Sequence, residues 1–466
     1  MALLDSLLNR LTMYRLMLYY LIVLVVASLF FSGFNPLAIL AQSIILLLTC
    51  YLTNLLFSKI FKVPTNFESF AITALILTLI VGPFARRSLG EVGLLTIIAV
   101  LAMASKYLLV LNKRHIFNPA ALAVTITAIF LGQGASWWIG NQTMLPFLIL
   151  GGLIILRKIR RFSLVLVFLF VATVLSRSFA NLFSPSLIFF ASVMLIEPFT
   201  SPVFFKFQIV YAAAVATFFV ILSSFVPYPL ELSLLIGNLF CYLVSPTSRF
   251  KLELKHKLQL APDIFAFYFL PEKEIKFLPG QYLEWTLSHP HSDSRGTRRF
   301  FTIASSPSEP EIMLVSKFAE MGSSFKKSLQ SLPAGRQVFA NGPAGEFTLT
   351  DKSLVFIAGG IGITPFRSMV KYLLDTNKSQ DIILLYSAKT EADFVFKDLF
   401  SQAKIKTVYT TNRVDEELIK KEVPDFKTRT FYVSGPEPMV QATEKILRTI
   451  GISRSHIHRD YFPGYL

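Results

Sequence analysis

Long apolar runs separated by short polar breaks fill the first half of the chain. We identify about ten such runs, and most approach the roughly 20 apolar residues that a helix needs to cross a bilayer. They lie at 12–31, 36–57, 69–85, 91–110, 118–132, 143–157, 162–176, 184–197, 207–225 and 229–245. The pattern predicts a polytopic α-helical membrane domain over residues 1–247.

The pattern changes after a cluster of helix-breaking residues at 245–248. Segments 250–260 and 266–270 alternate like strands, and strand signals separated by Pro/Gly turns continue to about residue 350. From 353 onward a strand, a glycine turn, a helix and a second strand follow one another, which is the order of a βαβ unit. We therefore predict an antiparallel β-barrel domain at 248–350 and an α/β domain at 351–466.

Charged residues are distributed unevenly. Residues 1–248 hold 15 of the 45 Lys and Arg and only 5 of the 29 Asp and Glu, as a membrane domain would. The net charge of +16 is therefore no sign of a nucleic-acid partner, because no basic stripe or reader motif accompanies it. Cys50 and Cys241 lie inside apolar runs, so we expect small buried side chains and no metal site.

The basic residues of the first half gather in alternate loops. One set of loops holds Arg10, Lys59, Lys62, Lys113, Arg114, Arg157, Lys158, Arg160, Arg161, Lys206 and Arg249. The other set holds only Arg86, Arg87 and Arg177. The positive-inside rule then predicts an integral protein of the cell (inner) membrane, in contact with lipid, with both termini and the domains after residue 247 in the cytoplasm.

Three motifs stand out in the predicted barrel, and two of them suit the binding of an anion. In RRFFTIASSP (298–307), Arg299 and Phe301 would share one face of a strand and Thr302 the other, and an arginine can fork onto a pyrophosphate. LPGQYLEW (278–285) supplies a Pro-Gly-Gln turn. MGSSFKKSL (321–329) combines Gly322, which permits close backbone approach, with Ser323 and Ser324 at a helix N-terminus.

These motifs resemble those of the ferredoxin-NADP reductase family, whose flavin motif reads Arg-x-Tyr/Phe-Ser/Thr. The resemblance implies FAD as cofactor, with Arg299 on its pyrophosphate, Phe301 beside the flavin and Thr302 at the isoalloxazine edge. It also implies that Gly322, Ser323 and Ser324 form a second phosphate site.

Two further motifs resemble the nucleotide half of the same family and imply NADH or NADPH as cosubstrate. AGGIGITPFRSM (358–369) carries the glycine turn, with the expected residues Gly359, Gly360, Gly362, Thr364 and Pro365. YVSGPEPMV (432–440) resembles the family's Cys-Gly-Pro-x-x-Met, with Gly435, Pro436 and Met439 in place. Ser434 stands where the family has cysteine near the nicotinamide, so the departure bears on the rate of hydride transfer. Thr302 and Ser434 are the candidate catalytic residues.

Two points about this half stay open. Lys389 follows the second strand of the α/β domain, where a lysine either pairs with a 2′-phosphate or is simply exposed, so the choice between NADH and NADPH is undecided. The chain ends in DYFPGYL (460–466), where Phe462 or Tyr465 either lies against the flavin or packs on the sheet.

Segments 67–77, 106–124 and 194–202 resemble parts of two related flavin-carrying membrane proteins, one belonging to the sodium-pumping NADH:quinone reductase and the other to the Rnf complex. Asn118-Pro119 and Glu197-Pro198 can break helices, which a membrane tolerates where the break lines a cavity. Lys106, Asn118 and Glu197 therefore mark a candidate polar site. The alternative is that Lys106, Glu197 and Glu68 lie near the interface and extend their charges into water.

That family carries FMN covalently within a Ser/Thr-Gly-Ala-Ser/Thr motif, in the stretch that matches 132–144 here. Ser136 and Thr143 lack those neighbours, so we predict no covalent flavin, and non-covalent FMN, riboflavin or a quinone stays open. A haem-bearing reductase needs pairs of axial histidines, and residues 1–248 contain only His115.

The sequence therefore predicts a membrane-bound flavin-dependent oxidoreductase. It would pass electrons from NAD(P)H through FAD to an acceptor in or across the membrane, either a quinone, a second flavin or a partner redox protein. A redox-driven ion transporter, and a reductase whose membrane half is only an anchor, are the alternatives.

Overall fold

The computed structural model describes residue 8 and residues 11–61, 67–83, 88–111, 114–202, 204–244, 248–290, 292–293, 296–318, 322–350 and 353–460. The predicted breaker cluster, apart from Ser248, and the terminal Phe462 and Tyr465 lie outside these residues. The chain divides into two compact units, Leu11–Pro246 and Thr247–Leu466.

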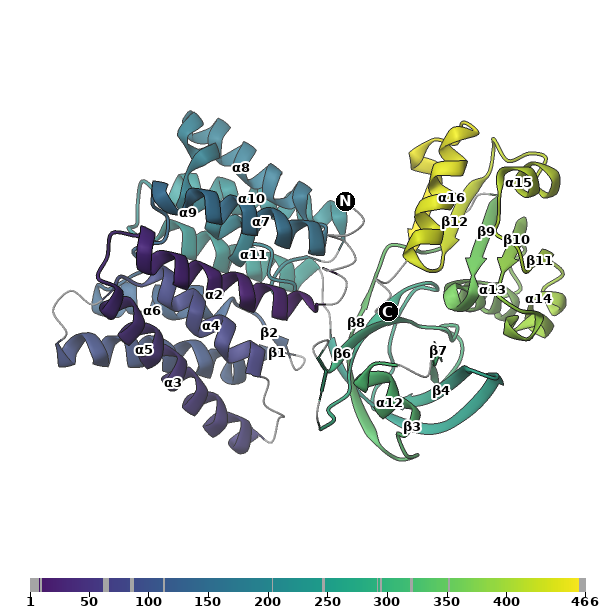
Figure 1. Cartoon of the computed structure of the whole chain (residues 1–466), viewed down its shortest axis with the longest axis horizontal. Helices are drawn as coiled ribbons and strands as arrows, with labels where there is room; N and C mark the ends of the chain where they lie inside the picture. The colour runs from purple at the N-terminus through teal and green to yellow at the C-terminus, as the bar shows by residue number, and fades with distance from the viewer. Residues whose placement is uncertain are drawn as a thin grey trace. The chain divides into compact units, whose positions relative to one another are not determined.

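The N-terminal unit is helical (Figure 1). Within the described residues, five helical stretches are long and apolar enough to cross a membrane: α2 (Met13–Phe31), α3 (Pro36–Phe61), α5 (Leu89–Leu108), the stretch Gln142–Ile159 and α10 (Phe205–Leu222). The stretch Gln142–Ile159 consists of η1 (Gln142–Met144) followed by α7 (Leu145–Ile159). Shorter apolar helices are α4 (Phe67–Ile80), α6 (Pro119–Leu131), α8 (Phe162–Ser176), Pro185–Met194 and α11 (Pro229–Val244). The count of about ten spans therefore stays a prediction.

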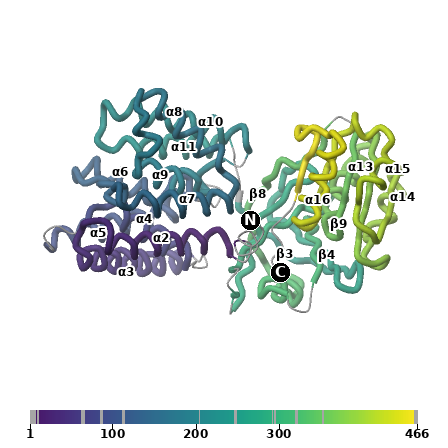
Figure 2. Tube along the Cα trace, turned by 45° about the horizontal axis from the view of Figure 1, so that its top comes forward, coloured from purple at the N-terminus to yellow at the C-terminus, as the bar shows by residue number. Residues whose placement is uncertain are grey.

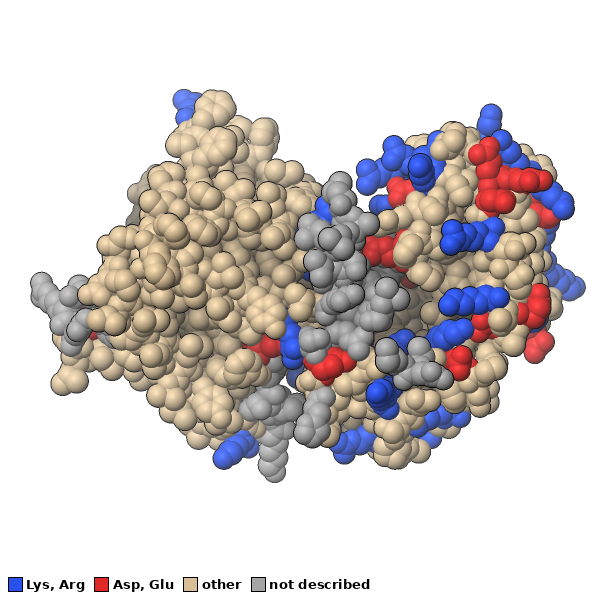
Figure 3. Space-filling view, in the orientation of Figure 1, with Lys and Arg blue, Asp and Glu red and all other residues tan. Residues whose placement is uncertain are grey.

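The outward faces of these helices are apolar, unlike those of helices in water. Val23 of α2 is 54% exposed, Phe30 is 76% exposed and Phe130 of α6 is 78% exposed. On the face drawn in Figure 3, charged side chains are sparse over this unit and dense over the C-terminal unit. Large contiguous apolar surfaces on a protein indicate an interaction with lipid or another apolar partner.

Two breaks interrupt the helical pattern of this unit. The short hairpin β1 (Val110–Leu111) and β2 (Arg114–His115) precedes α6, whose N-cap is Asn118 and whose first residue is Pro119. The predicted run at 184–197 is not one regular helix: α9 (Pro185–Phe189) passes into a π-helical segment, η3 (Phe190–Met194), and the chain then turns at Glu197. The start of α6 and the turn at Glu197 lie at the prolines that the sequence marked, whereas the π-helical segment contains no proline.

The first domain of the C-terminal unit is a six-stranded antiparallel half-barrel with strand order β6-β5-β8-β3-β4-β7. Its strands are β3 (Ser248–Ala261), β4 (Ile264–Pro271), β5 (Tyr282–Thr286), β6 (Arg298–Thr302), β7 (Ile312–Lys317) and β8 (Gln337–Ala344). Alternate residues such as Leu252, Leu254, Phe267 and Phe269 fill its core, which the short helix α12 (Ser324–Gln330) closes with Phe325 and Leu329.

The second domain is a parallel sheet of order β11-β10-β9-β12-β13 with helices on both faces (Figures 1 and 2). The strands are β9 (Leu354–Gly359), β10 (Ile382–Ser387), β11 (Lys406–Thr410), β12 (Thr430–Ser434) and β13 (Ile457–Asp460), and the helices are α13 (Thr364–Asp375), α14 (Lys397–Gln402), α15 (Glu416–Glu422) and α16 (Glu437–Thr449). Successive residues of β9 enter opposite cores. Phe356 packs with α13 and α14, while Val355 and Ile357 pack with α15 and α16.

Polar and apolar contacts join the two domains of this unit. Arg367 of α13 forms an ion pair with Glu309 and donates to the carbonyl of Ala304 at 3.1 Å. The Ser368 hydroxyl donates to the carbonyl of Ser305 at 2.6 Å. The core around Phe366 also includes residues of the half-barrel such as Phe347. The ends of β6 and β12 are therefore held in a defined arrangement.

Candidate functional site

Three polar side chains from strand ends of the two domains meet within the C-terminal unit. Thr302 is the last residue of β6, and Ser434 and Asp460 are the last residues of β12 and β13. Asp460 pairs with Ser434 across the parallel ladder, and its carboxyl group accepts hydrogen bonds from the hydroxyls of both Thr302 and Ser434. Thr302 and Ser434 are 7% and 3% exposed. The two predicted catalytic residues are thus brought together by a third residue.

Asp460 is the residue of this site that the sequence did not reveal. Burial raises the pKa of its carboxyl group to about 7, and the hydrogen bonds from Thr302 and Ser434 oppose that rise. A carboxyl group that titrates near neutral pH is typical of functional sites. Its position at the end of a strand, directly before the terminal aromatic stretch, was the one available signal.

The predicted flavin strand and the helix that follows the second phosphate motif pack against each other. The Arg299 guanidinium lies over the ring of Phe325, 5.3 Å from its centroid, and the Phe301 ring lies 5.9 Å from the same ring. Arg299 and Phe301 therefore share one face of β6, as the alternation of a strand requires. Arg299 is 7% exposed and donates to the carbonyl of Gly296 at 3.3 Å.

The second phosphate motif folds as a capped helix start. The Ser323 hydroxyl caps α12 by accepting from the backbone N–H of Lys326, and Gly322 precedes it. The Ser324 hydroxyl accepts from the backbone N–H of Asp293 at 2.9 Å, while the Ser324 backbone N–H donates to the Asp293 carboxylate at 2.9 Å. The Asp293 carboxylate also lies 3.9 Å from the Arg299 guanidinium. An acidic side chain thus adjoins the arginine that we predicted to bind phosphate.

The two nucleotide motifs pack so closely that their glycines are needed. A Cβ on Gly362 would lie 2.3 Å from the Ser434 carbonyl oxygen, and one on Gly359 would lie 2.5 Å from the Met439 sulfur. A Cβ on Gly435 would meet the same sulfur at 2.8 Å. Gly360 has a φ of +54° and faces open space, so its backbone is accessible to a ligand.

The remaining residues of these motifs begin helices. Pro365 lies in the first turn of α13, directly after Thr364, whose hydroxyl donates to the carbonyl of Ile361 at 3.1 Å. Pro436 is the N-cap of α16. Both glycine-containing turns therefore lead from the carboxyl end of a parallel strand into a helix N-terminus, which is where nucleotides bind in open α/β sheets.

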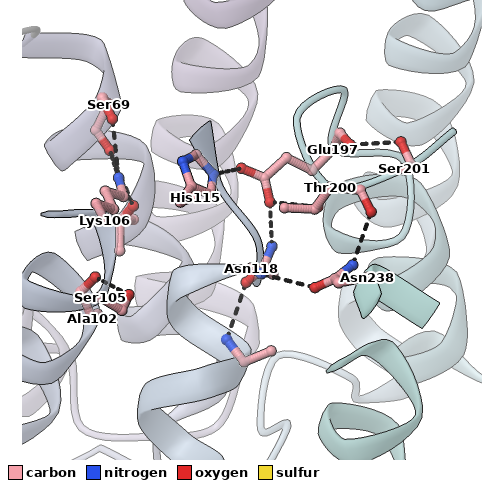
Figure 4. A network of polar contacts seen from close by, with 12 residues as sticks. Ser69, Ala102, Ser105, Lys106, His115, Asn118, Glu197, Thr200, Ser201 and Asn238 are labelled. Carbon is pink, nitrogen blue, oxygen red and sulfur yellow. Dashed lines mark hydrogen bonds and ion pairs between the residues drawn. The ribbon is translucent and has the colours of Figure 1, made fainter. Parts of the chain in front are cut away.

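The predicted polar residues of the N-terminal unit form two groups, drawn in Figure 4. In the first, the Asn118 side-chain amide donates to the Glu197 carboxylate at 2.7 Å, and the Asn118 backbone N–H donates to the Asn238 side chain at 2.8 Å. Thr200 also donates to Glu197, at 3.1 Å, and the His115 ring lies 3.7 Å from the same carboxylate. His115 and Asn238 are members of this group that the sequence reasoning did not assign.

Lys106 belongs to the second group. Its ammonium donates to the Ser69 carbonyl at 2.8 Å, to the Ser69 hydroxyl at 3.0 Å and to the Thr73 hydroxyl at 2.7 Å. Lys106 also interacts electrostatically with Glu197. A single apolar cavity, whose walls include Tyr14, Ile76 and Ile155, is lined in addition by Thr73, Asn118 and Glu197. Members of both groups therefore reach the same cavity.

Comparison with known proteins identifies the two domains of the C-terminal unit. Residues 250–349 match the family model of the oxidoreductase FAD-binding domain, and residues 356–445 match that of the oxidoreductase NAD-binding domain. The C-terminal unit carries the FAD-binding and NAD-binding oxidoreductase domains of the ferredoxin-NADP reductase family. Both family matches lie within residues 250–445, so the resemblance of the N-terminal unit to membrane proteins of the sodium-pumping reductase and the Rnf complex stays a prediction.

Curated relatives match less than half of the chain. The glycine betaine monooxygenase reductase subunit of Chromohalobacter salexigens is 27% identical over 225 residues, covering 43% of this chain and 60% of that protein. The NADH oxidoreductase HCR of Escherichia coli is 25% identical over 232 residues, covering 47% of this chain and 70% of that protein. The chain thus spans about 60% of the length of its first curated relatives.

Solved structures are also similar to less than half of the chain. The cytochrome P450 reductase GcoB of Amycolatopsis has 22% sequence identity and a TM-score of 0.42, covering 47% of this chain and 71% of that one. The FAD/NAD-binding domain of a nitric oxide dioxygenase from Vibrio cholerae has 20% identity and a TM-score of 0.41, covering 46% of this chain and 98% of that one.

Proposed function

We propose that the protein is a membrane-bound, flavin-dependent NAD(P)H oxidoreductase that passes electrons from NAD(P)H through FAD to an acceptor in or across the bilayer. The observation that carries the proposal is the meeting of Thr302, from the FAD-binding domain, with Ser434 and Asp460, from the NAD-binding domain. A hydride donor and its acceptor must come into contact, and this is where side chains of the two domains converge at the carboxyl ends of parallel strands.

The half-barrel supplies the residues that would hold FAD. Arg299 would bind the pyrophosphate, and Ser323 and Ser324 with Gly322 would form the second phosphate contact at the start of α12. Phe301 and Thr302 would adjoin the ring system. The packing of Arg299 and Phe301 on the same phenylalanine supports this assignment, because it places the strand motif and the helix start side by side.

The α/β domain supplies the residues that would hold the nicotinamide nucleotide. Gly360 leaves open space for a ligand in the first turn, Gly359 and Gly362 let that turn pack against the second, and Thr364 and Pro365 begin the helix behind it. Gly435, Pro436 and Met439 form the neighbouring turn against which the first turn packs. When bound, FAD would supply the hydride and single-electron chemistry of the reaction. The protein contributes position and hydrogen bonds, and Asp460 can hold a proton between the two hydroxyls near neutral pH.

The acceptor site that we propose lies in the N-terminal unit, at the cavity bordered by Asn118 and Glu197. Its walls are largely apolar, and its polar groups are linked to Lys106 through Thr73 and to His115 through Glu197. Apolar walls with a few polar groups are the chemistry that binds the ring of a quinone or a non-covalent flavin (FMN or riboflavin), and the cavity volume of about 80 Å³ means that its walls would have to move apart to admit one. A partner redox protein is the further candidate acceptor, since relatives of the C-terminal unit are named as reductase subunits of a monooxygenase and a demethylase.

We propose the inner membrane as the location, with both termini and the FAD and NAD(P) domains on the cytoplasmic side. The exposed apolar faces of α2 and α6 support contact with lipid, and the uneven loop charges support the orientation. A bare anchor needs neither a polar network nor a cavity inside its helices, because one apolar span is sufficient for anchoring.

The test compares two acceptors with the detergent-purified full chain. Glu197→Gln should lower the rate of quinone reduction by roughly tenfold or more, because it disturbs a hydrogen-bonded charged group at the cavity wall. Reduction of ferricyanide should be unchanged, because that small anion can collect electrons at the flavin. Glu91→Gln is the matched control, since glutamine also completes the helix cap that Glu91 makes. If Glu197→Gln leaves both rates unchanged, the acceptor does not use this cavity.

A further inference from the structure

One carboxyl group of the N-terminal unit has no charged partner among the residues that the structure describes. Glu231 lies in the first turn of α11 and is 1% exposed. Its Oε1 accepts a hydrogen bond from the Trp137 indole N–H at 3.0 Å, and its own backbone N–H also faces the carboxyl group. Its Oε2 is buried and has no hydrogen-bond partner within the described part of the chain. Both donors are neutral.

The other described acids of this unit differ from Glu231 in this respect. Glu68 pairs with the Arg15 guanidinium at 3.0 Å, and Glu197 has the His115 ring at 3.7 Å. Glu91 accepts from the backbone N–H of Ser88 in a capping box at the end of a helix. A buried carboxylate without a cation is costly, because neutral donors replace only part of the water that it loses. Binding a proton removes that cost.

The partner of Glu231 is held in an unusual backbone conformation. Trp137 has a φ of +52°, which a residue with a large side chain rarely adopts unless its surroundings enforce it. The backbone N–H groups of Ser136 and Trp137 both donate to the Ile80 carbonyl, at 2.8 and 3.0 Å. The indole ring packs edge-on against Phe189 and Phe190. The loop therefore fixes the indole N–H toward the carboxyl group.

Glu231 also lies on the same helix face as the polar network of the proposed acceptor site. Asn238 follows it by seven residues, which is two helical turns or roughly 10 Å along α11. Asn238 is fully buried and accepts from the backbone N–H of Asn118. A negative charge that enters this network acts on Glu231 across apolar surroundings, where electrostatic interactions are strong.

We propose that Glu231 is a proton-binding site of the N-terminal unit, which takes up a proton when the unit gains an electron. In this step a proton from water forms an O–H bond at Oε2, and the same bond breaks to return the proton to water when the electron leaves. Trp137 is a positioning residue that holds the carboxyl group through Oε1. The uptake step rests on the function proposed above, whereas the existence of the proton site does not.

Infrared difference spectroscopy of the full chain in detergent tests the site directly. A protonated carboxyl group has a carbonyl stretch that a carboxylate lacks. Near neutral pH, the wild-type protein should show a protonated-carboxyl band that Glu231→Gln removes and that the matched control Glu197→Gln retains. Trp137→Phe removes the hydrogen bond to Oε1, so it should change the frequency of this band without removing it. Identical wild-type and Glu231→Gln spectra between about pH 5 and pH 9 overturn the proposal.

Two further arms separate the alternatives. If addition of sodium ions at fixed pH abolishes the band while choline does not, the site binds a metal cation and the proposed proton site is wrong. Reduction with NAD(P)H, at the pH where the band of the oxidised protein is half its maximum, should increase the band in the wild-type protein. A band that is present but does not respond to reduction shows that electrons do not reach this unit, which contradicts the proposed function and the uptake step but leaves the proton site standing.

Discussion

Replacing Asp460 with asparagine should change how the stability of the C-terminal unit depends on pH. Burial raises the pKa of the Asp460 carboxyl group from 3.8 to about 7 in the folded protein. The folded state therefore holds this proton more tightly than the unfolded state does. The stabilising contribution is fully present below pH 3.8, decreases as the unfolded chain ionises, and is lost once the pH has risen through about 7.

The size of the effect follows from the two pKa values. Once the carboxyl group is fully ionised, the difference between the two pKa values corresponds to a loss of roughly 4 kcal/mol in the free energy of unfolding. Between about pH 5 and pH 8 this loss is at most about 2.6 kcal/mol. Asp460 keeps part of its surface exposed, so solvent screening reduces this loss to roughly 1–2 kcal/mol. For a unit of this size, such a loss lowers the melting temperature by roughly 2–8 °C.

The assay is thermal unfolding of the full chain, followed by the fluorescence of released FAD, at the two pH values. Other titrating groups are common to both proteins, so the quantity of interest is the melting temperature of the wild type minus that of Asp460→Asn. This difference should fall by the stated amount between pH 5 and pH 8. Parallel pH profiles of the two proteins would refute the reasoning, because Asp460 would then titrate alike in the folded and unfolded chains.

Three other outcomes are expected. Arg299→Ala should weaken FAD retention roughly 10- to 100-fold, because a charged hydrogen-bond donor is lost. Arg299→Lys should retain FAD to an intermediate degree. Full FAD occupancy with unchanged turnover in Arg299→Ala would count against the flavin assignment. Gly362→Ala should lower NAD(P)H affinity and the melting temperature, because its Cβ would meet the Ser434 carbonyl at 2.3 Å, whereas Gly93→Ala, with nothing within 4 Å, should do neither. The purified protein should show no Soret band and no flavin fluorescence that survives denaturation, and either signal contradicts the exclusion of haem or of covalent flavin.

Much of the C-terminal unit could be predicted because its signals are local. The alternation at 250–260 predicted part of β3, and the glycine turn at 359–362 predicted the passage from β9 into α13. Asp460 could not be predicted, because its role depends on the register between β12 and β13 and on the end of β6, about 160 residues away in the sequence. The sequence of the four-residue strand β13 contains no signal that predicts these neighbours of Asp460.

In the N-terminal unit, too, local features could be predicted and contacts between distant segments could not. Asn118-Pro119 correctly marked the start of α6, since both residues have a local role there, but the partners His115 and Asn238 come from separate segments. Helix lengths were less predictable. Apolar composition gives the same signal for a regular helix and for the π-helical segment at 190–194, because hydrophobicity carries no information about hydrogen-bond register.

The most direct test of the central claim compares the intact protein with a truncated chain of residues 249–466. Both should reduce ferricyanide with NAD(P)H at similar rates, because the FAD-binding and NAD-binding domains lie within residues 250–445. Only the intact protein should reduce a lipid-soluble quinone quickly or, in sealed vesicles, transfer electrons across the membrane to enclosed ferricyanide. Equal quinone rates for the two proteins, together with no transfer across the vesicle membrane, would contradict an electron acceptor in the N-terminal unit.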